Sequence, residues 1–267
     1  MKQIRLGLVG VGNMGTSILE GVLARQLTIP SRIWVYDKAL DKAKAFARRH
    51  KVGLASSTAE LIQKTDTILL AMKPQDFVLF AAENRSYFKA GQIVISILAG
   101  MTTGKIAQAL GKKVVIVRAM PNLCAKVGQS MTVVCGKNKK ALSLASALFA
   151  ACGEVVTLPE KSLDLVTAMS GSGPAYFFHL MELTTDFGVK QGLPLKVAET
   201  LAVQTGLGAA LVAKNSKVSC ATLREMVTSK KGTTEAALKT LKRKKFGKIF
   251  HQALTAAMDR SRALRGS

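Results

Sequence analysis

The residues best suited to chemistry form the glycine motif Gly10-Val11-Gly12-Asn13-Met14-Gly15. Six mostly apolar residues that favour a strand precede it, and an amphipathic helical pattern follows it. In such a motif the first glycine permits a tight turn, the second lets the backbone approach a pyrophosphate, and the third lets the helix pack on the strand. Free N–H groups and the positive end of the helix dipole would hold the anion. The motif predicts a dinucleotide site; the alternative is a glycine-rich turn without a ligand.

A second strand is expected at residues 32–36 and ends at Asp37, 22 residues after Gly15. That spacing is typical of the carboxylate that binds the adenosine ribose. A carboxylate there accepts hydrogen bonds from both ribose hydroxyls and repels a 2′-phosphate, so Asp37 favours NADH over NADPH. The alternative is a structural aspartate in a turn or at a helix cap. Lys38 and Lys42 lie beside it and can still attract a phosphate.

Four further strands are expected, at residues 67–71, 92–97, 114–118 and 131–135. Apolar strands that alternate with helical segments predict a mainly parallel, doubly wound sheet. Ligands of such sheets lie beyond the carboxyl ends of the strands. The turns after the third and fourth strands are therefore expected to line the cofactor cleft. Their residues are Ala71, Met72, Lys73, Pro74, Ala99 and Gly100.

After about residue 159 the strand signals stop, and helices are expected at residues 163–169, 176–191, 195–215, 221–228, 233–244 and 246–264. The segment 195–215 is apolar or small on nearly every face, and such a helix must be buried. A helical domain of about a hundred residues buries little by itself, so we expect it to pack against a second subunit. The predicted fold class is α/β: a Rossmann-type doubly wound sheet in residues 1–159, then an all-helical dimerisation domain in residues 160–267.

Two stretches of the helical part can form a site. Residues 170–176 are small and permit close backbone approach, with Pro174 in the first turn of the next helix; the alternative is a packed helix kink. In residues 227–238, Thr233 or Thr234 can cap a helix whose free N–H groups bind a carboxylate. An ordinary capped turn is the alternative there.

The net charge, the lack of long apolar stretches and the cysteine positions limit the functions that the chain can have. The net charge is +23, from 39 basic and 16 acidic residues, which favours anionic ligands: a dinucleotide, a carboxylate or nucleic acid. The basic run at residues 239–248 has no accompanying nucleic-acid motif, so we interpret it as a solvated helix face. The sequence shows neither a signal peptide nor a stretch of about 18 apolar residues, which predicts a cytoplasmic protein without a membrane partner. Four scattered cysteines predict free thiols and no metal site.

Five separated stretches together resemble the pyrroline-5-carboxylate reductase family over essentially the whole chain. They are the glycine motif, Ala71-Met72-Lys73-Pro74, Arg118-Ala119-Met120-Pro121-Asn122, residues 170–176, and Val227-Thr228-Ser229 with Gly232-Thr233-Thr234. Five motifs in the right order are far more specific than the glycine motif alone.

The resemblance implies reduction of Δ1-pyrroline-5-carboxylate to L-proline, the last step of proline biosynthesis, with NADPH or NADH as cofactor. It implies a homodimer, which some members assemble into decamers, with the active site at the interface of two domains and two subunits. By the same resemblance Met120, Asn122 and Ser229 bind the substrate. Backbone N–H groups at Gly232, Thr233 and Thr234 hold its carboxylate, and the Thr234 hydroxyl is offered to the ring nitrogen.

The chain departs from the family pattern near the expected substrate site. Lys230-Lys231 replaces Pro-Gly in the loop that usually reads Thr-Ser-Pro-Gly-Gly-Thr-Thr, and Leu123-Cys124 replaces Thr-Pro after Asn122. An acidic residue common ahead of the loop is replaced near Lys217. Two alternatives therefore stay open: a related imine or β-hydroxyacid reductase with another substrate, and a basic nucleic-acid-binding protein that keeps a nucleotide fold.

Overall fold

The structure, a computed structural model, describes residues 4–111 and 113–266. The chain forms two compact units. The first comprises Met1–Ser172 together with Ala257–Ser267, and the second comprises Gly173–Ala256. A single helix near the C-terminus, α12 (Phe246–Gly266), contributes residues to both units.

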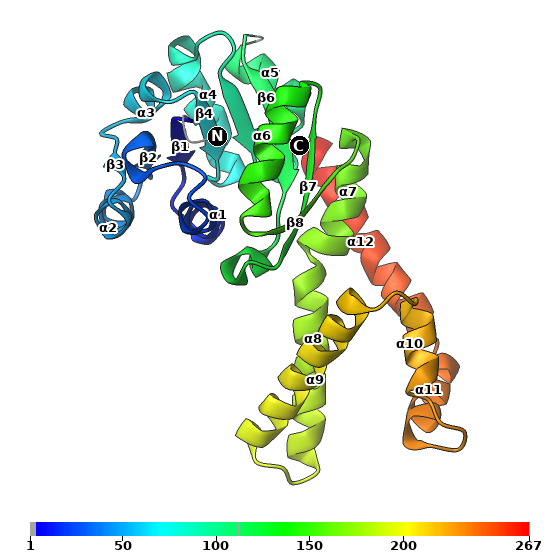
Figure 1. The fold of residues 1–267 in the computed structure, drawn as a ribbon. Coiled ribbons are helices and arrows are strands. Elements are labelled where there is room, and N and C mark those ends of the chain that lie inside the picture. The colour runs from blue at the N-terminus through cyan, green and yellow to red at the C-terminus, as the bar shows by residue number, and fades with distance from the viewer. Residues whose placement is uncertain (1–3, 112, 267) are drawn as a thin grey trace. The chain divides into compact units, whose positions relative to one another are not determined.

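The first unit alternates strands and helices (Figure 1). Its strands are β1 (Leu6–Val9), β2 (Ile33–Tyr36), β3 (Gly53–Leu54), β4 (Thr67–Leu70), β5 (Ile93–Ser96), β6 (Val115–Met120), β7 (Ser130–Gly136) and β8 (Gly153–Thr157). Its helices are α1 (Asn13–Ala24), α2 (Leu40–His50), α3 (Thr58–Lys64), α4 (Phe77–Asn84), α5 (Thr103–Leu110), α6 (Lys139–Ala150) and α7 (Leu163–Val166).

Within the described residues the strands form one eight-stranded sheet in the order β3-β2-β1-β4-β5-β6-β7-β8. Neighbouring strands are parallel except β6 and β7, which pair antiparallel. The strand order reverses between β1 and β4, which is the point where doubly wound sheets bind dinucleotides. The mainly parallel sheet predicted from the sequence is confirmed. Two strands were not predicted from the sequence: β3, which has only two residues, and β8, on the edge of the sheet.

Two hydrophobic cores cover the two faces of the sheet, because successive strand residues point to opposite sides. Leu6 and Leu8 of β1 pack with α1, α2 and α6 on one face, whereas Ile68 and Leu70 of β4 pack with α3, α4 and α5 on the other (Figure 1). These side chains are almost fully buried. The first unit therefore has a complete core of its own, which fixes the positions of the strand ends.

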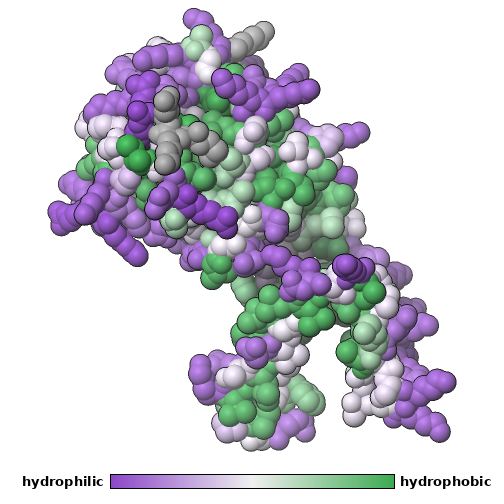
Figure 2. Space-filling model, in the orientation of Figure 1, coloured by the Kyte–Doolittle hydropathy of each residue, from purple (hydrophilic) through white to green (hydrophobic). Residues whose placement is uncertain are grey.

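The second unit contains α8 (Gly173–Lys190), α9 (Leu195–Asn215), α10 (Cys220–Met226), α11 (Thr233–Arg243) and the first half of α12. Helices α8 and α9 approach closely because small residues face each other: a Cβ added to Gly188 would lie 3.0 Å from the Ala198 Cβ. Ala198 and Ala202 are the buried hydrophobic residues of this unit. Broad apolar areas, drawn green, lie on the surface of its helices in Figure 2.

Helix α9 has the bounds predicted from the sequence, but within this chain most of it is exposed. Leu201, Leu207 and Leu211 are each about half exposed, with relative accessibilities of 54%, 49% and 49%. Among the described residues it is the one helix long and apolar enough to cross a membrane by length and composition. The helix passes on its mean hydropathy, which its valines and alanines raise. Glu199 and Gln204 interrupt its apolar residues, so it is not the continuous stretch of about 18 apolar residues whose absence the sequence analysis noted.

The compact units are not divided at residues 159 and 160: residues 160–172 and 257–266 group with the first unit. The helix expected at residues 163–169 is also interrupted, since α7 ends at Val166 and a π-helical turn, Thr167–Gly171, follows it. Pro174 lies in the first turn of α8, as expected.

Candidate active site

The turn after β1 has a backbone that only glycine adopts easily. Gly10 has a φ of +103°, and a Cβ added there would lie 2.6 to 2.7 Å from the Ala71 and Met72 backbone. The Gly10 N–H donates to the Tyr36 carbonyl oxygen at 2.9 Å. The turn therefore passes tightly between the ends of β2 and β4. This is the place at which the glycine motif predicted a nucleotide.

Gly12 and Gly15 differ in what surrounds them. A Cβ added to Gly12 meets nothing within 4 Å, whereas one added to Gly15 would overlap the Gly10 carbonyl oxygen. Gly12 is the N-cap of α1, brings no side chain to the first turn, and is followed by no acidic residue there. Helix N–H groups and the positive end of the helix dipole thus face open space, an arrangement that fits a pyrophosphate.

Asp37 is more constrained than the sequence indicates. One carboxylate oxygen accepts the Val11 N–H at 2.7 Å, and the other accepts the Ala39 N–H at 2.8 Å. The second bond is an aspartate turn, so the structural alternative considered from the sequence is present; the N-cap of α2 is Ala39. Each oxygen keeps a second lone pair for a ribose hydroxyl. Asp37 therefore holds the glycine turn in addition to any ribose contact.

The turn after β4 carries an ion pair that the sequence analysis missed. Lys38 Nζ lies 3.0 and 2.9 Å from the two carboxylate oxygens of Asp76. Asp76 ends the short 3-10 helix Pro74–Asp76, whose N-cap is Lys73. Ala71 and Met72 precede this 3-10 helix, and Met72 packs against the core that contains Ile68 and Leu70 of β4. The ion pair thus joins the loops that follow β2 and β4.

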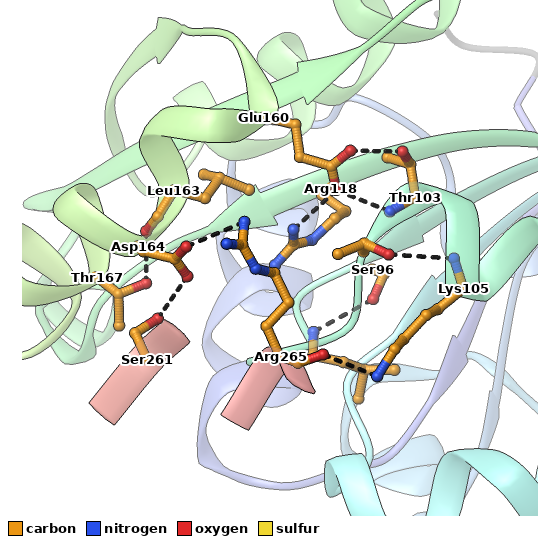
Figure 3. A network of polar contacts seen from close by, with 12 residues as sticks. Ser96, Thr103, Lys105, Arg118, Glu160, Leu163, Asp164, Thr167, Ser261 and Arg265 are labelled. Atoms are coloured by element: carbon orange, nitrogen blue, oxygen red, sulfur yellow. Dashed lines mark hydrogen bonds and ion pairs between the residues drawn. The ribbon is translucent and has the colours of Figure 1, made fainter. Parts of the chain in front are cut away.

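The turn after β5 packs against the end of α12. Gly100 has a φ of +75°, and a Cβ added there would lie 2.7 Å from the Leu264 carbonyl oxygen. Lys105 Nζ donates to the Arg265 carbonyl oxygen at 2.8 Å (Figure 3). Packing against α12 thus explains the glycine at position 100 independently of the cofactor role predicted for Ala99 and Gly100. Ala99 is exposed.

Asp164 anchors α12 from the other side. Its carboxylate accepts the Ser261 hydroxyl at 2.9 Å and lies 3.1 Å from Arg265 Nη1 (Figure 3). The Asp164 side chain is 12% exposed. Both contacts join residues of the first unit that are about a hundred positions apart in the chain. Sequence reasoning missed them because neither α7 nor α12 carries a local signal for a partner so distant.

A second acidic residue connects β6 to α5. Glu160 lies 2.8 Å from Arg118 Nη1 and accepts the Thr103 N–H at 2.7 Å, at the first residue of α5 (Figure 3). Burial acts to raise the pKa of Glu160, but the hydrogen bonds from Thr103 and Arg118 together outweigh it and lower the pKa. Glu160 is therefore charged at neutral pH and compensates the buried guanidinium of Arg118.

Met120 and Asn122, predicted to bind the substrate, pack against the π-helical turn. The Asn122 side chain accepts the Cys124 N–H at 3.1 Å and donates to the Ser170 carbonyl oxygen at 3.0 Å. A Cβ added to Gly171 would lie 2.6 Å from Met120 Cε. The small residues at 170–171 therefore leave room for the Met120 side chain. The hydrogen bond from the Asn122 amide fixes the position of this turn. Single π-helical turns are frequent at functional sites.

The loop ahead of α11, in the second unit, holds the remaining predicted site residues. Gly232 is the N-cap, so the expectation that Thr233 or Thr234 caps the helix was wrong; both lie in its first turn. Gly232 packs so tightly on Ser229 that a Cβ there would overlap the Ser229 hydroxyl oxygen. The extended backbone of Gly232 occupies the N-cap position, so neither threonine is the capping residue.

Glu235 stabilises this loop, a role that the sequence analysis missed. Its carboxylate accepts the Lys231 N–H at 2.8 Å, and Lys231 has a φ of +60°, in the left-handed region. The bond from Lys231 and then the contact with Lys239 lower the pKa of Glu235. This is a variant of the capping box, in which an acidic residue of the first turn binds an N–H just before the helix. The signal was visible as an acidic residue three positions after Gly232.

The structure thus groups the predicted residues into two sets, one in each unit. Residues 10–15, 37, 71–74, 99–100, 120 and 122 lie at the carboxyl ends of the strands, whereas residues 229 and 232–234 lie at the start of α11. All four cysteines are free thiols, as predicted. Burial raises the pKa of Cys135 and of Cys152 to about 11, so neither is a thiolate nucleophile at neutral pH. Within the described residues no group of three or more metal-ligating side chains is present.

A doubly wound sheet with an open glycine turn at its reversal point is the site at which oxidoreductases that use a nicotinamide dinucleotide bind their cofactor, and this is the class of protein that the fold and the site indicate. Comparison with known families agrees. Residues 5–100 match the family described as NADP oxidoreductase, coenzyme F420-dependent, and residues 160–264 match the family described as pyrroline-5-carboxylate reductase dimerisation.

Individual proteins identify the family over the whole chain. A pyrroline-5-carboxylate reductase of Pseudomonas aeruginosa is 35% identical and covers 99% of this chain and 98% of its own length. A solved pyrroline-5-carboxylate reductase from Coxiella burnetii is 34% identical with a TM-score of 0.91, and each chain is covered to 98%. The Plasmodium falciparum pyrroline carboxylate reductase with NADP bound is 28% identical with a TM-score of 0.88 over 99% of each chain. This chain belongs to the pyrroline-5-carboxylate reductase family.

The reaction follows from this membership. The protein reduces Δ1-pyrroline-5-carboxylate to L-proline with NADPH or NADH, the last step of proline biosynthesis. The match to the dimerisation family also agrees with the exposed apolar side chains of α9, which lies inside residues 160–264. The resemblance inferred from the five sequence motifs is therefore confirmed for family, fold and activity.

Proposed function

We propose that the carboxyl ends of β1, β2, β4 and β5 hold the cofactor. The observation that carries this assignment is the open space at Gly12, where the first turn of α1 presents its N–H groups without a capping side chain. The residues assigned to the cofactor are Gly10, Val11, Gly12, Asn13, Met14, Gly15, Asp37, Ala71, Met72, Lys73, Pro74, Ala99 and Gly100.

The substrate carboxylate is assigned to the start of α11. Gly232, Thr233 and Thr234 provide backbone N–H groups at the positive end of that helix, and Ser229 packs against Gly232. Lys230 and Lys231, both exposed, add positive charge ahead of the helix and attract an anion from solution. Met120 and Asn122 complete the assigned set, with Asn122 acting by holding the backbone of its own turn.

Thr234 is assigned as the catalytic residue. The reduced nicotinamide, when bound, supplies a hydride to the imine carbon, and the ring nitrogen of the substrate retains a proton to become the amine of proline. The Thr234 hydroxyl accepts a hydrogen bond from that nitrogen and keeps the ring in one orientation. No strong protein acid is needed because a protonated imine is already electron-poor. Positioning by α11 and by the strand ends therefore supplies most of the catalysis.

The chain is further proposed to act in the cytoplasm as a homodimer, with a decamer of five dimers as the larger assembly. The apolar side chains of α9 support a second copy as its partner, since a soluble surface rarely exposes so many. The +23 charge is assigned to attraction of anionic substrates, and neither nucleic acid nor a membrane is expected as a partner. In this assignment residues 1–159 are the cofactor domain and residues 160–267 the substrate and dimerisation domain.

Thr234→Ala tests the catalytic assignment. Loss of one hydrogen bond to a charged group costs about 1.5–3 kcal/mol, which lowers kcat/KM about tenfold to a hundredfold. The measurement is oxidation of NADH and NADPH with pyrroline-5-carboxylate, together with cofactor affinity by calorimetry, which stays at the wild-type value. Thr233→Ala is the matched control, because its side chain is exposed at the preceding position of the same turn. Unchanged turnover and efficiency in Thr234→Ala would place the catalytic group elsewhere.

A further inference from the structure

The Lys38–Asp76 ion pair occupies a distinctive position in the sheet. Lys38 follows Asp37 at the end of β2, and Asp76 closes the turn after β4. In the strand order, β2 and β4 flank β1 on either side (Figure 1). The ion pair therefore connects the two loops next to the glycine turn. Both carboxylate oxygens of Asp76 contact the ammonium, at 3.0 and 2.9 Å.

The position next to Asp37, the acidic residue that follows β2, matters for the choice between NADH and NADPH. NADH and NADPH differ only by a phosphate on the adenosine ribose, and proteins that accept the phosphate place a cation near this strand end. Lys38 is the cation next to Asp37 in this chain. The Asp37 carboxylate is fixed on the Val11 and Ala39 N–H groups, so it cannot easily turn away from an incoming phosphate.

We propose that Asp76 determines cofactor preference by holding Lys38 away from the ribose 2′-phosphate. This inference rests on the proposed cofactor site. With Asp76 in place, a 2′-phosphate meets the Asp37 charge while Lys38, the lysine adjacent to Asp37 in the chain, is already paired, which favours NADH. The Lys38 side chain is 73% exposed, and exposed ion pairs are weak. The phosphate can therefore compete for Lys38, so NADPH is used less well rather than excluded.

The test compares two probes that bind the adenosine half of the site without any reaction. These are adenosine 5′-monophosphate and adenosine 2′,5′-bisphosphate, which differ by the 2′-phosphate alone, and their affinities are measured by calorimetry at low and high salt. Asp76→Asn should raise the affinity ratio in favour of the bisphosphate about fivefold, which corresponds to releasing one exposed ion pair. High salt should reduce this gain. The NADPH to NADH ratio of kcat/KM should rise in parallel.

A double-mutant cycle separates release of Lys38 from simple removal of a negative charge. Lys38→Met should lower the affinity of the bisphosphate and leave that of the monophosphate unchanged. In the Lys38→Met background, Asp76→Asn should lose most of its effect, because Lys38, the partner that Asp76 releases, is absent. Lys38→Arg should rescue the binding of the bisphosphate.

Asp66→Asn is the matched control. Asp66 forms an exposed ion pair with Arg5, with 2.7 Å between the charged atoms. Arg5 precedes β1 and Asp66 precedes β4, so this pair lies at the end of the two strands opposite to the glycine turn. The substitution changes the net charge by the same amount as Asp76→Asn. It should leave the affinity ratio unchanged, and thermal unfolding should show that both variants are folded.

The outcomes separate this inference from the proposed function. If wild-type protein binds NADH but Asp76→Asn leaves the ratio of the two probes unchanged, Asp76 does not control preference and the cofactor site stands. An equal rise in Asp66→Asn, or a full effect of Asp76→Asn without Lys38, would also overturn the role of Lys38. If neither probe nor NADH binds wild-type protein, the assignment of the cofactor site fails and this inference fails with it.

Discussion

The two units of the chain bury their apolar side chains in different ways. In the first unit, two cores cover the two faces of the sheet, and leucines such as Leu8 and Leu69 are almost fully buried. In the second unit the buried hydrophobic residues are Ala198 and Ala202, whereas Phe177, Phe187 and Leu201 are more than half exposed. The first unit has the core that a domain needs to fold, whereas the proposed dimer would supply the helical unit with the burial that it lacks within one chain.

The difference also separates two kinds of ligand site. The residues proposed to bind the cofactor follow strand ends that a complete core holds in place, and ion pairs at Asp76, Glu160 and Asp164 connect the surrounding turns. The loop at residues 229–234 of the second unit, proposed to bind the substrate and called the substrate loop below, is held mainly by Glu235 and by the packing of Gly232 on Ser229. The substrate loop is therefore expected to respond more strongly to assembly than the cofactor site.

The largest expected effect comes from placing charges on α9. Leu207→Glu with Leu211→Glu should abolish the dimer, because burial of two leucines contributes about 3–6 kcal/mol and buried carboxylates are unfavourable. Light scattering at micromolar concentration measures the mass, and circular dichroism the loss of helix in the second unit. Lys196→Glu changes the charge equally at a side chain that is 89% exposed, and should leave the dimer intact. A folded wild-type monomer at micromolar concentration would show that the helical unit does not need a second copy of the chain.

Glycine substitutions in the first unit should separate binding from folding. Gly12→Val places a side chain in open space and should weaken cofactor binding about a hundredfold while stability changes by less than about 1 kcal/mol. Gly10→Ala should instead destabilise the unit by about 1–3 kcal/mol, since its φ is +103° and the Ala71 backbone leaves no room. Calorimetry with NADH and thermal unfolding report the two quantities. Wild-type NADH affinity in Gly12→Val would rule out the pyrophosphate assignment.

Glu160→Gln tests the ion pair that supports β6 and α5. The loss should be about 1.5–3 kcal/mol of unfolding free energy, because the buried guanidinium of Arg118 loses its charged partner. The pKa of Glu160 is lowered in the folded state, so its stabilisation is fully present above the unfolded pKa and is lost as the pH falls through the folded pKa. Urea unfolding from neutral to acidic pH should therefore show a smaller acid-induced loss in Glu160→Gln. Glu83→Gln, at an exposed position, is the control.

The smallest effect is expected in the substrate loop. Lys231→Gly should stabilise the protein by up to about 1 kcal/mol, because a left-handed backbone costs a lysine more than a glycine. Lys230→Gly removes the same charge without this relief and should be neutral or slightly destabilising. Both variants, and the double change Lys230→Pro with Lys231→Gly, should weaken the salt dependence of kcat/KM. If the salt dependence is unaltered, the two lysines do not attract the substrate.

The sequence was sufficient for the parts of the fold that have a local pattern. The glycine motif predicted the turn between β1 and α1, and the length of the apolar run at residues 195–215 predicted α9 with its observed bounds. It was insufficient for β3, whose two residues give no periodic signal, and for the cap of α11, where Gly232 replaced the expected threonine. The π-helical turn before α8 was visible only as an interruption of the helical pattern.

The sequence by itself determined the family, the reaction and, apart from β3 and β8, the order of strands and helices, because glycine spacing, strand-end turns and helix periodicity are encoded by residues close together in the chain. The tertiary structure decided which side chains are partners. Asp37 holds the Val11 N–H, Asp76 holds Lys38, and Asp164 holds Ser261. These partners are 26 to 97 positions apart in the chain. Pairings at such separations depend on which strand ends and helix ends the fold brings together, and no local pattern records them.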